Sequence, residues 1–265
     1  MLAEIAAQHP EVVATFAEAS AGAGIDLGQL AQQGPEARLN RTEHTQPALL
    51  AAGIAVWRVW NKLGGAQPAL LAGHSLGEYT ALVAAGALDL AEAAALVAER
   101  GRLMQEAVPE GEGAMAAVLG GDDALIAEVC AEVAEGQVVA PANFNAPGQT
   151  VIAGQADAVA RALARLAERG VRKSVCLPVS VPSHCELMRE AAARLAERMA
   201  SVSWRMPQVC CRMSRRAPTA ASSTFARRWS ASCTCRCAGA SRCRCWPRRA
   251  SRASPSADRA RYWPD

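Results

Sequence analysis

Residues 68–79 read PALLAGHSLGEY, and this stretch decides the fold. Residues 68–72 form a short apolar run of buried-strand length, and residues 78–85 continue as an apolar helical segment. Between them, Gly73-His74-Ser75-Leu76-Gly77 matches the Gly-x-Ser-x-Gly pattern, which raises a serine hydroxyl above the end of a sheet when it lies at a strand-to-helix turn. Glycines on both sides allow the sharp, strained backbone of such a turn. We therefore predict an α/β fold with Ser75 as a nucleophile, the alternative being an ordinary buried turn.

A nucleophilic serine needs a base, and the only histidines in the chain are His9, His44, His74 and His184. The first two are expected at the surface or in loops, and the third would point away from the serine beside it. His184 precedes a predicted helix over residues 185–200, where Ser183 and Glu186 have capping-box spacing. At the first helical position the helix dipole would keep an imidazole neutral, as a general base must be. His184 is therefore the predicted base, although it could also simply start the helix.

Two further groups are expected to face a substrate. The N–H of Leu76, at the start of the helix after the serine, is predicted to point at an oxyanion. Arg100 lies on a predicted helix over residues 89–107 and projects from its apolar stripe, whereas Arg102 belongs to the polar face. A buried guanidinium needs a partner, which could be a carboxylate of the protein itself or one carried by a substrate. The residues alone leave both possibilities open.

The order of elements predicts a second, smaller domain. Residues 111–179 read as strand, helix, strand, strand, helix, strand, the order of a ferredoxin-like unit. Residues 1–110 and 180–208 are expected to form the larger α/β domain around the serine motif. It begins with two short helices within residues 1–20 and includes a further helix over 47–63.

The last part of the chain differs in composition from the rest. Residues 209–265 hold 13 of the 28 basic residues and two of the 25 acidic ones, giving a charge of +11 against −8 for the remainder. They also hold seven of the ten cysteines, and Val209 and Phe225 are their only valine, leucine, isoleucine or phenylalanine residues. We interpret this segment as a disordered tail translated out of frame. A basic nucleic-acid arm and a cysteine metal cluster are the alternatives.

Composition excludes other classes of protein. With 51% hydrophobic residues the chain is not disordered throughout, and its longest uncharged apolar stretch, residues 47–57, is shorter than the roughly 18 residues that span a bilayer. Residues 1–208 contain only three scattered cysteines, which is typical of a reducing compartment. We expect a cytoplasmic protein that binds neither membranes nor nucleic acid.

Five ordered motifs resemble one family. They are TQPAL (45–49), GHSLGEY (73–79), GAMAAV (113–118), NFNAPGQ (143–149) and VSVPSHC (179–185). Together they closely resemble the malonyl-CoA:acyl carrier protein transacylases of bacterial fatty acid synthesis, over residues 1 to 208. The resemblance implies that Ser75 carries the acyl group, that His184 is its general base and that Arg100 holds the malonyl carboxylate. It also implies that Gln46 and Asn145 line the same pocket.

The resemblance sets expectations for the whole molecule. It implies an α/β-hydrolase-like large domain with an inserted ferredoxin-like domain, and an acyltransferase that takes malonyl from a coenzyme A thioester and gives it to acyl carrier protein. No cofactor is expected, and the chain is expected to be a monomer. Met1 lies just after the position of a family Pro-Gly-Gln-Gly-Ser-Gln motif, and the match stops near residue 208, so we expect a chain shortened at its start and frameshifted after 208. A serine hydrolase, or an inactive remnant that binds carrier protein, is the alternative.

Overall fold

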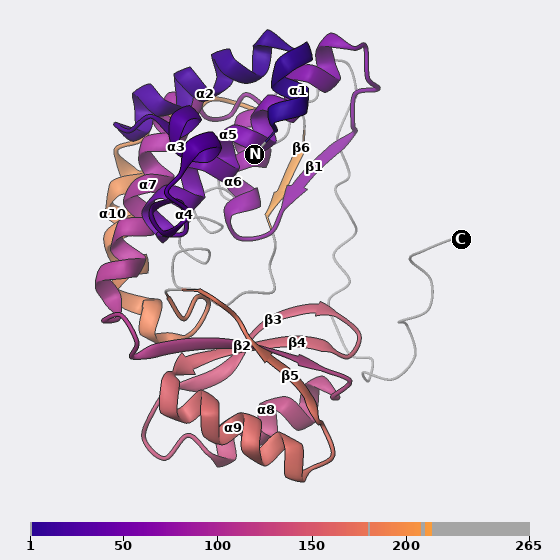
Figure 1. Ribbon diagram of the computed structural model, residues 1–265, viewed down its shortest axis with the longest axis vertical. Helices are drawn as coiled ribbons and strands as arrows, with labels where there is room; N and C mark the ends of the chain where they lie inside the picture. The colour runs from indigo at the N-terminus through magenta and orange to yellow at the C-terminus, as the bar shows by residue number, and fades with distance from the viewer. Residues whose placement is uncertain (1, 180, 208–209, 214–265) are drawn as a thin grey trace.

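The computed structural model describes residues 2–179, 181–207 and 210–213, which form a helical body and a smaller sheet-and-helix unit (Figure 1). The helices are α1 (Ala3–Gln8), α2 (Pro10–Ala23), α3 (Leu27–Gln33), α4 (Glu36–Leu39), α5 (Thr42–Lys62), α6 (Leu76–Ala84), α7 (Leu90–Ala107), α8 (Asp123–Glu132), α9 (Ala156–Glu168), the short 3-10 turn η1 (Glu186–Met188) and α10 (Arg189–Ala200). The strands are β1 (Leu70–Gly73), β2 (Gly113–Leu119), β3 (Val139–Ala146), β4 (Gln149–Gln155), β5 (Lys173–Cys176) and β6 (Cys210–Met213). None of the described helices is long and apolar enough to cross a membrane.

The larger unit is built on helix packing around one apolar core. Helices α2, α5 and α7 contact one another, and α6 and α10 pack beside them. Fully buried side chains from these helices include Leu50 and Ile54 on α5 and Leu96 on α7. The helix predicted over 47–63 begins five residues earlier, at Thr42. Pro47 removes one backbone donor in the second turn without ending the helix, and its ring is buried.

The strand before the serine pairs in parallel with a strand from the end of the described chain. Leu70 lies opposite Cys210 and Gly73 opposite Met213. Strand β6 falls inside the segment 209–265 that composition set apart as a disordered tail, so the structure differs from that expectation at residues 210–213. Residues 209 and 214–265 lie outside the described residues.

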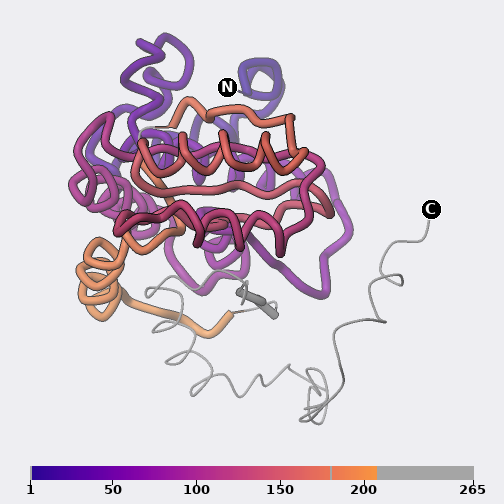
Figure 2. Tube along the Cα trace, turned by 90° about the horizontal axis from the view of Figure 1, so that it is seen from below, coloured from indigo at the N-terminus to yellow at the C-terminus, as the bar shows by residue number. Residues whose placement is uncertain are grey.

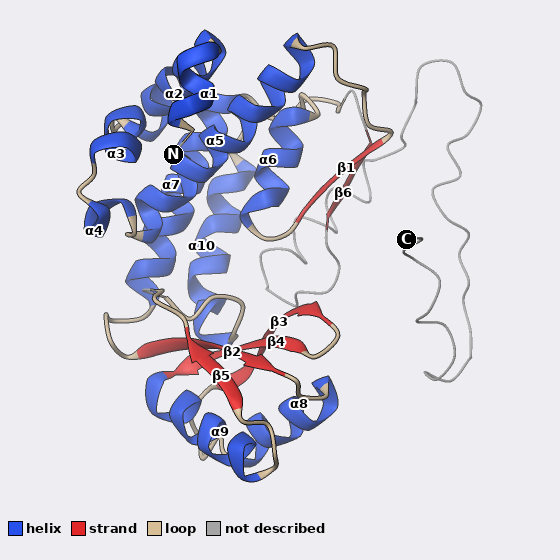
Figure 3. Cartoon of the chain, turned by 45° about the vertical axis from the view of Figure 1, so that its right-hand side comes forward, coloured by secondary structure: helices blue, strands red, loops and turns tan. Residues whose placement is uncertain are grey.

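The smaller unit has the predicted ferredoxin-like architecture. Its four-stranded sheet has the order β3-β4-β2-β5, with antiparallel pairing throughout. Helices α8 and α9 lie side by side on one face of the sheet (Figure 2) and bury an apolar cluster that includes Ile126, Ile152 and Leu166. The other face turns toward the larger unit (Figure 3), and the smaller cluster there includes Met115, Val151 and Ala153. This face positions part of the candidate site.

The starts of two helices are capped differently. Asp89 caps α7 by accepting from the Ala91 N–H at 3.0 Å, and Glu92 accepts from the Ser203 N–H. The capping box predicted from Ser183 and Glu186 does not form. The helix expected over 185–200 begins with η1, and no side chain caps η1 or α10. Because His184 has φ +64°, it is not the first helical residue but lies in a left-handed turn before the helix.

Candidate functional site

Ser75 lies at a strained turn between β1 and α6. Its backbone has φ 53° and ψ −114°, a conformation that a non-glycine residue adopts only where the surroundings impose it. A Cβ built on Gly73 would lie 2.0 Å from the carbonyl carbon of Gly77, so these two segments approach too closely for any side chain at position 73. The turn therefore has the geometry predicted for the motif, with Leu76 as the first residue of α6.

Arg100 reaches the serine from α7. Its Nη2 donates to Ser75 Oγ at 3.1 Å, and its Nη1 donates to Gln46 Oε1 on α5 at 2.5 Å. The guanidinium carbon lies 5.9 Å from the ring centroid of Tyr79, a buried residue of α6. Burial is the main cause that raises the pKa of the Tyr79 hydroxyl. The structure thus brings together three of the predicted site residues: Gln46 from α5, Ser75 from the turn before α6, and Arg100 from α7.

No carboxylate neutralises Arg100 within the described part of the chain. Its two side-chain partners there, Gln46 and Ser75, are both uncharged. Arg102, two positions along the same helix, faces outward and pairs with Glu99 at 2.6 Å and Glu106 at 3.3 Å. The two arginines therefore lie on the two helix faces that the sequence pattern assigned to them.

Gln46 is a buried polar residue with two partners. Its side chain is 6% exposed, its oxygen accepts from Arg100, and its Nε2 donates to Met104 Sδ at 3.5 Å. Both groups of the carboxamide are therefore satisfied inside the protein.

His184 lies in the turn before η1 and faces His74. The two ring centroids are 5.5 Å apart and the ring planes are inclined by 45°. Burial, then the charge of Arg100, then His74 lower the pKa of His184 to about 4, so the imidazole is neutral at pH 7. The sequence attributed this neutrality to a helix dipole, but burial is the larger cause. Among the described residues no hydrogen bond joins His184 to Ser75, and Nδ1 of His184 is buried without a partner.

The structure leaves Asn145 exposed near the end of β3, and in the described chain no hydrogen bond links it to Ser75, Arg100 or Gln46. Asn143, two residues earlier, lies opposite Val151 and so shares the sheet face that turns toward the larger unit. Its Oδ1 is buried and has no partner among the described groups. Sequence reasoning missed Asn143, although it belongs to the same quoted motif as Asn145.

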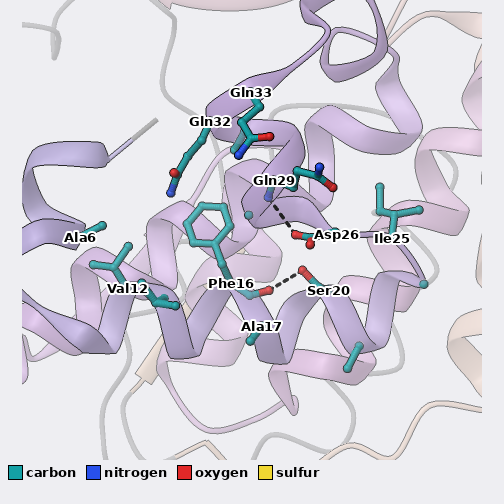
Figure 4. Close-up of a pocket in the computed structure, with 15 residues that line it drawn as sticks. Ala6, Val12, Phe16, Ala17, Ser20, Ile25, Asp26, Gln29, Gln32 and Gln33 are labelled. Carbon is teal, nitrogen blue, oxygen red and sulfur yellow. Dashed lines mark hydrogen bonds between the residues drawn. The ribbon is translucent and has the colours of Figure 1, made fainter.

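A separate groove lies between α2 and α3, and none of its lining residues belongs to the serine turn (Figure 4). It encloses about 1010 Å³ and is lined by Val12, Phe16, Ile25 and several glutamines. Its one carboxylate, Asp26, accepts from the Gln29 N–H and so caps α3. Its one serine hydroxyl, Ser20 Oγ, donates to the Phe16 carbonyl and accepts from the Leu27 N–H, so this groove presents no serine–histidine pair.

Comparison with known proteins gives consistent matches. The acyl transferase domain family matches residues 5–238. The malonyl CoA-acyl carrier protein transacylases of Salmonella typhimurium and Escherichia coli are each 58% identical over 209 residues, which are 79% of this chain and 68% of each relative. The crystal structure of malonyl-CoA:acyl carrier protein transacylase from Xanthomonas oryzae is 66% identical with a TM-score of 0.79, covering 80% of this chain and 67% of that one. A complex of a malonyl-transacylase with a type II polyketide acyl carrier protein is 51% identical with a TM-score of 0.81, covering 86% and 74%.

Proposed function

The chain belongs to the acyl transferase family of malonyl CoA-acyl carrier protein transacylases, and from this we propose that it transfers malonyl from malonyl-CoA to the phosphopantetheine thiol of an acyl carrier protein. The proposal assigns the acyl intermediate to Ser75. It assigns proton transfer to His184 and carboxylate binding to Arg100.

The observation that carries this proposal is the unneutralised guanidinium beside the nucleophile. Arg100 lies 3.1 Å from Ser75 Oγ and has only uncharged side-chain partners among the described residues. A guanidinium binds a carboxylate through two parallel hydrogen bonds. Because it is so close to Oγ, it suits an acyl group whose carboxylate is separated from the ester carbonyl by a single methylene, as in malonyl.

The acylation half-reaction uses Ser75 and His184. The Oγ attacks the thioester carbonyl carbon, and its proton passes to the neutral imidazole of His184. When the tetrahedral intermediate collapses, the carbon–sulfur bond breaks and the imidazolium returns the proton to the departing coenzyme A thiolate. The product is a malonyl ester on Ser75, with His184 neutral again.

The second half-reaction is the reverse, with a different thiol. The carrier protein's thiol gives its proton to His184 and attacks the ester carbonyl, and Ser75 recovers the proton as it leaves. During both steps the negative oxygen faces the N–H of Leu76, the first residue of α6, where the helix dipole adds to the hydrogen bond. Every step is an acyl or proton transfer, so the reaction requires no metal or redox cofactor.

The proposal includes the setting of the reaction. The carrier protein is the partner, as it is for the related transacylase in the complex. The few scattered cysteines of residues 1–208 suit a reducing cytoplasm. We also propose that the chain acts as a monomer, which sedimentation with and without carrier protein tests.

A serine hydrolase is less well supported. A hydrolase of this motif type uses a carboxylate to orient its histidine. No carboxylate contacts Nδ1 of His184 in the described chain. Malonate released from malonyl-CoA without a thiol acceptor would measure this alternative directly.

The decisive experiment is to incubate the 265-residue chain with malonyl-CoA and look for a malonyl ester on the Ser75 peptide by mass spectrometry. We expect the ester to form and to disappear when holo acyl carrier protein is added, with malonyl appearing on the carrier. Ser75→Ala should give no ester, while Ser20→Ala, at the α2–α3 groove, should give the normal amount. An undiminished ester in Ser75→Ala would refute the assignment.

A further inference from the structure

Met104 has an unexplained polar contact beneath the site. Its thioether accepts from Gln46 Nε2 at 3.5 Å, and the same carboxamide accepts from Arg100 Nη1 at 2.5 Å. Met104 lies four residues after Arg100 on α7, so both side chains project from one helix face. The contact series Met104–Gln46–Arg100–Ser75 thus ends at the nucleophile.

The chemistry of the two end groups fixes the orientation of Gln46. A guanidinium only donates hydrogen bonds, and a thioether only accepts them. The carboxamide satisfies both only with its oxygen toward Arg100 and its nitrogen toward Met104. If the amide turned over, its NH2 would face the guanidinium and its oxygen would face sulfur, leaving buried polar groups unpaired.

This orientation affects the charge that a substrate meets. Gln46 Oε1 holds Nη1 of Arg100 without neutralising it, which keeps Nη2 directed at Ser75. A leucine at position 104 would fill similar space but would leave Gln46 Nε2 buried without an acceptor, so the carboxamide would be held at its oxygen end alone. The Arg100 guanidinium would then have a less firmly fixed partner.

Met104 is also anchored to the segment that carries His184. It is 8% exposed and belongs to a small apolar cluster with Val108, Val181 and Met188. Val181 and Met188 lie on either side of His184 in the sequence. Met188 therefore lies in the same cluster as Met104 and is buried to a similar extent. Among the described residues it makes no hydrogen bond with Gln46.

We propose that Met104 is a positioning residue whose thioether orients Gln46 and so aligns Arg100 for acyl groups that carry a carboxylate. The proposal deepens the proposed function and rests on it. It assigns part of the selection of malonyl over acetyl to a methionine that is connected to Ser75 only through Gln46 and Arg100.

The test compares Met104→Leu with the matched control Met188→Leu in the full chain. Met104→Leu should lower kcat/KM for malonyl-CoA by roughly three- to tenfold, the usual effect of one lost hydrogen bond, and change acylation by acetyl-CoA less than twofold. Met188→Leu should leave the malonyl-to-acetyl ratio unchanged. In a Gln46→Ala background, Met104→Leu should have no further effect on the ratio. Equal loss on both acyl groups, or the same ratio in both leucine variants, would overturn the proposal.

A second readout does not depend on catalysis. In 15N-labelled protein the side-chain NH2 signals of Gln46, assigned with Gln46→Ala, should shift and exchange faster with solvent in Met104→Leu but not in Met188→Leu. Unchanged signals in Met104→Leu would refute the positioning role even if malonyl transfer is confirmed. Absence of any Ser75 ester in the unmutated chain would instead refute the proposed function, and the amide signals would still decide the role of Met104.

Discussion

Arg100 Nη2 donates to Ser75 Oγ across 3.1 Å, although the two residues are 25 positions apart in the sequence. The contact places a full positive charge one hydrogen bond from the atom that would carry the acyl group. In the described chain Arg100 is half-buried and has no anionic partner, so its place beside the serine costs part of its solvation, which an anionic substrate would recover. Under the proposed function, the side chain that selects the acyl group would therefore also position the nucleophile.

Replacing Arg100 should change acyl selectivity more than total reactivity. Arg100→Ala removes the guanidinium that would bind a malonyl carboxylate, so malonyl transfer should fall by about 100-fold, within the range for lost charge-assisted hydrogen bonds. Acetyl transfer should fall much less, because acetyl offers the guanidinium no anion. Competition between malonyl-CoA and acetyl-CoA, with ester formation on Ser75 followed by mass spectrometry, measures the ratio.

Arg102→Ala is the matched control for this prediction. It removes an arginine side chain from the outer face of α7, where Arg102 forms ion pairs with Glu99 and Glu106. Exposed ion pairs contribute little, so malonyl transfer should stay within about twofold of the unmutated chain. Equal losses on malonyl and acetyl in Arg100→Ala would make Arg100 a structural residue.

Local sequence patterns predicted the elements better than the contacts between them. The order of apolar runs and helical periods located all six elements of the ferredoxin-like unit, most directly its two helices, which each bury one apolar face against the sheet. The position of Arg100 on the apolar face of α7 was predicted for the same reason. Its pairing with Gln46, 54 residues away, depends on how α5 and α7 cross, which no local pattern encodes.

His184 shows where local reasoning gave the wrong geometry. The spacing of Ser183 and Glu186 permits a capping box, but the structure places His184 at φ +64° in a turn. Val181 and Met188 are buried against α7 on both sides of this turn, and that tertiary packing replaces the local capping preference. A role for Met104 was not predicted, because a methionine on the apolar stripe of a helix has the sequence pattern of an ordinary core residue.

The two glycines of the serine motif should respond differently to alanine. A Cβ on Gly73 would lie 2.0 Å from the backbone of Gly77, so Gly73→Ala must displace the turn that carries Ser75. We expect it to lower the free energy of unfolding by about 1–3 kcal/mol, as overpacking does, and to abolish the Ser75 ester. Urea unfolding and the malonyl ester assay measure both effects.

Gly77→Ala is the internal control, since a Cβ there would meet no atom within 4 Å. The free energy of unfolding of Gly77→Ala should be unchanged or slightly higher, because alanine has a higher helix propensity than glycine. If Gly77→Ala proved as damaging as Gly73→Ala, the close backbone approach would not be the reason for glycine at position 73.

The pH dependence of acylation should reflect a strongly lowered histidine pKa. With the pKa of His184 near 4, the base stays neutral through the weakly acidic range, so the rate of Ser75 acylation should be flat from pH 8 to about 5 and fall below that. Arg100→Ala removes one cause of the low His184 pKa, so the rate of acylation should begin to fall at a higher pH. His74→Ala should shift this fall in rate by a smaller amount, because His74 is the weaker cause. An uncharged ester such as p-nitrophenyl acetate reads the profile in both variants, and a fall centred near pH 6.5 in the unmutated chain would contradict it.

The same group should make the fold less stable in acid. The unfolded chain protonates His184 near the ordinary histidine pKa of 6.5, whereas the folded chain does so only near 4, so between these values the unfolded state binds more protons. The free energy of unfolding should therefore decrease as pH falls from 6.5 to 4, by no more than about 1.4 kcal/mol per pH unit from this residue.

The variant His184→Gln tests this prediction, because glutamine is polar but does not titrate. The free energy of unfolding of the variant should fall less steeply over this interval than that of the unmutated chain. Parallel urea titrations at closely spaced pH values measure the two slopes, and identical slopes for His184→Gln and the unmutated chain would show that His184 is not held neutral by the fold.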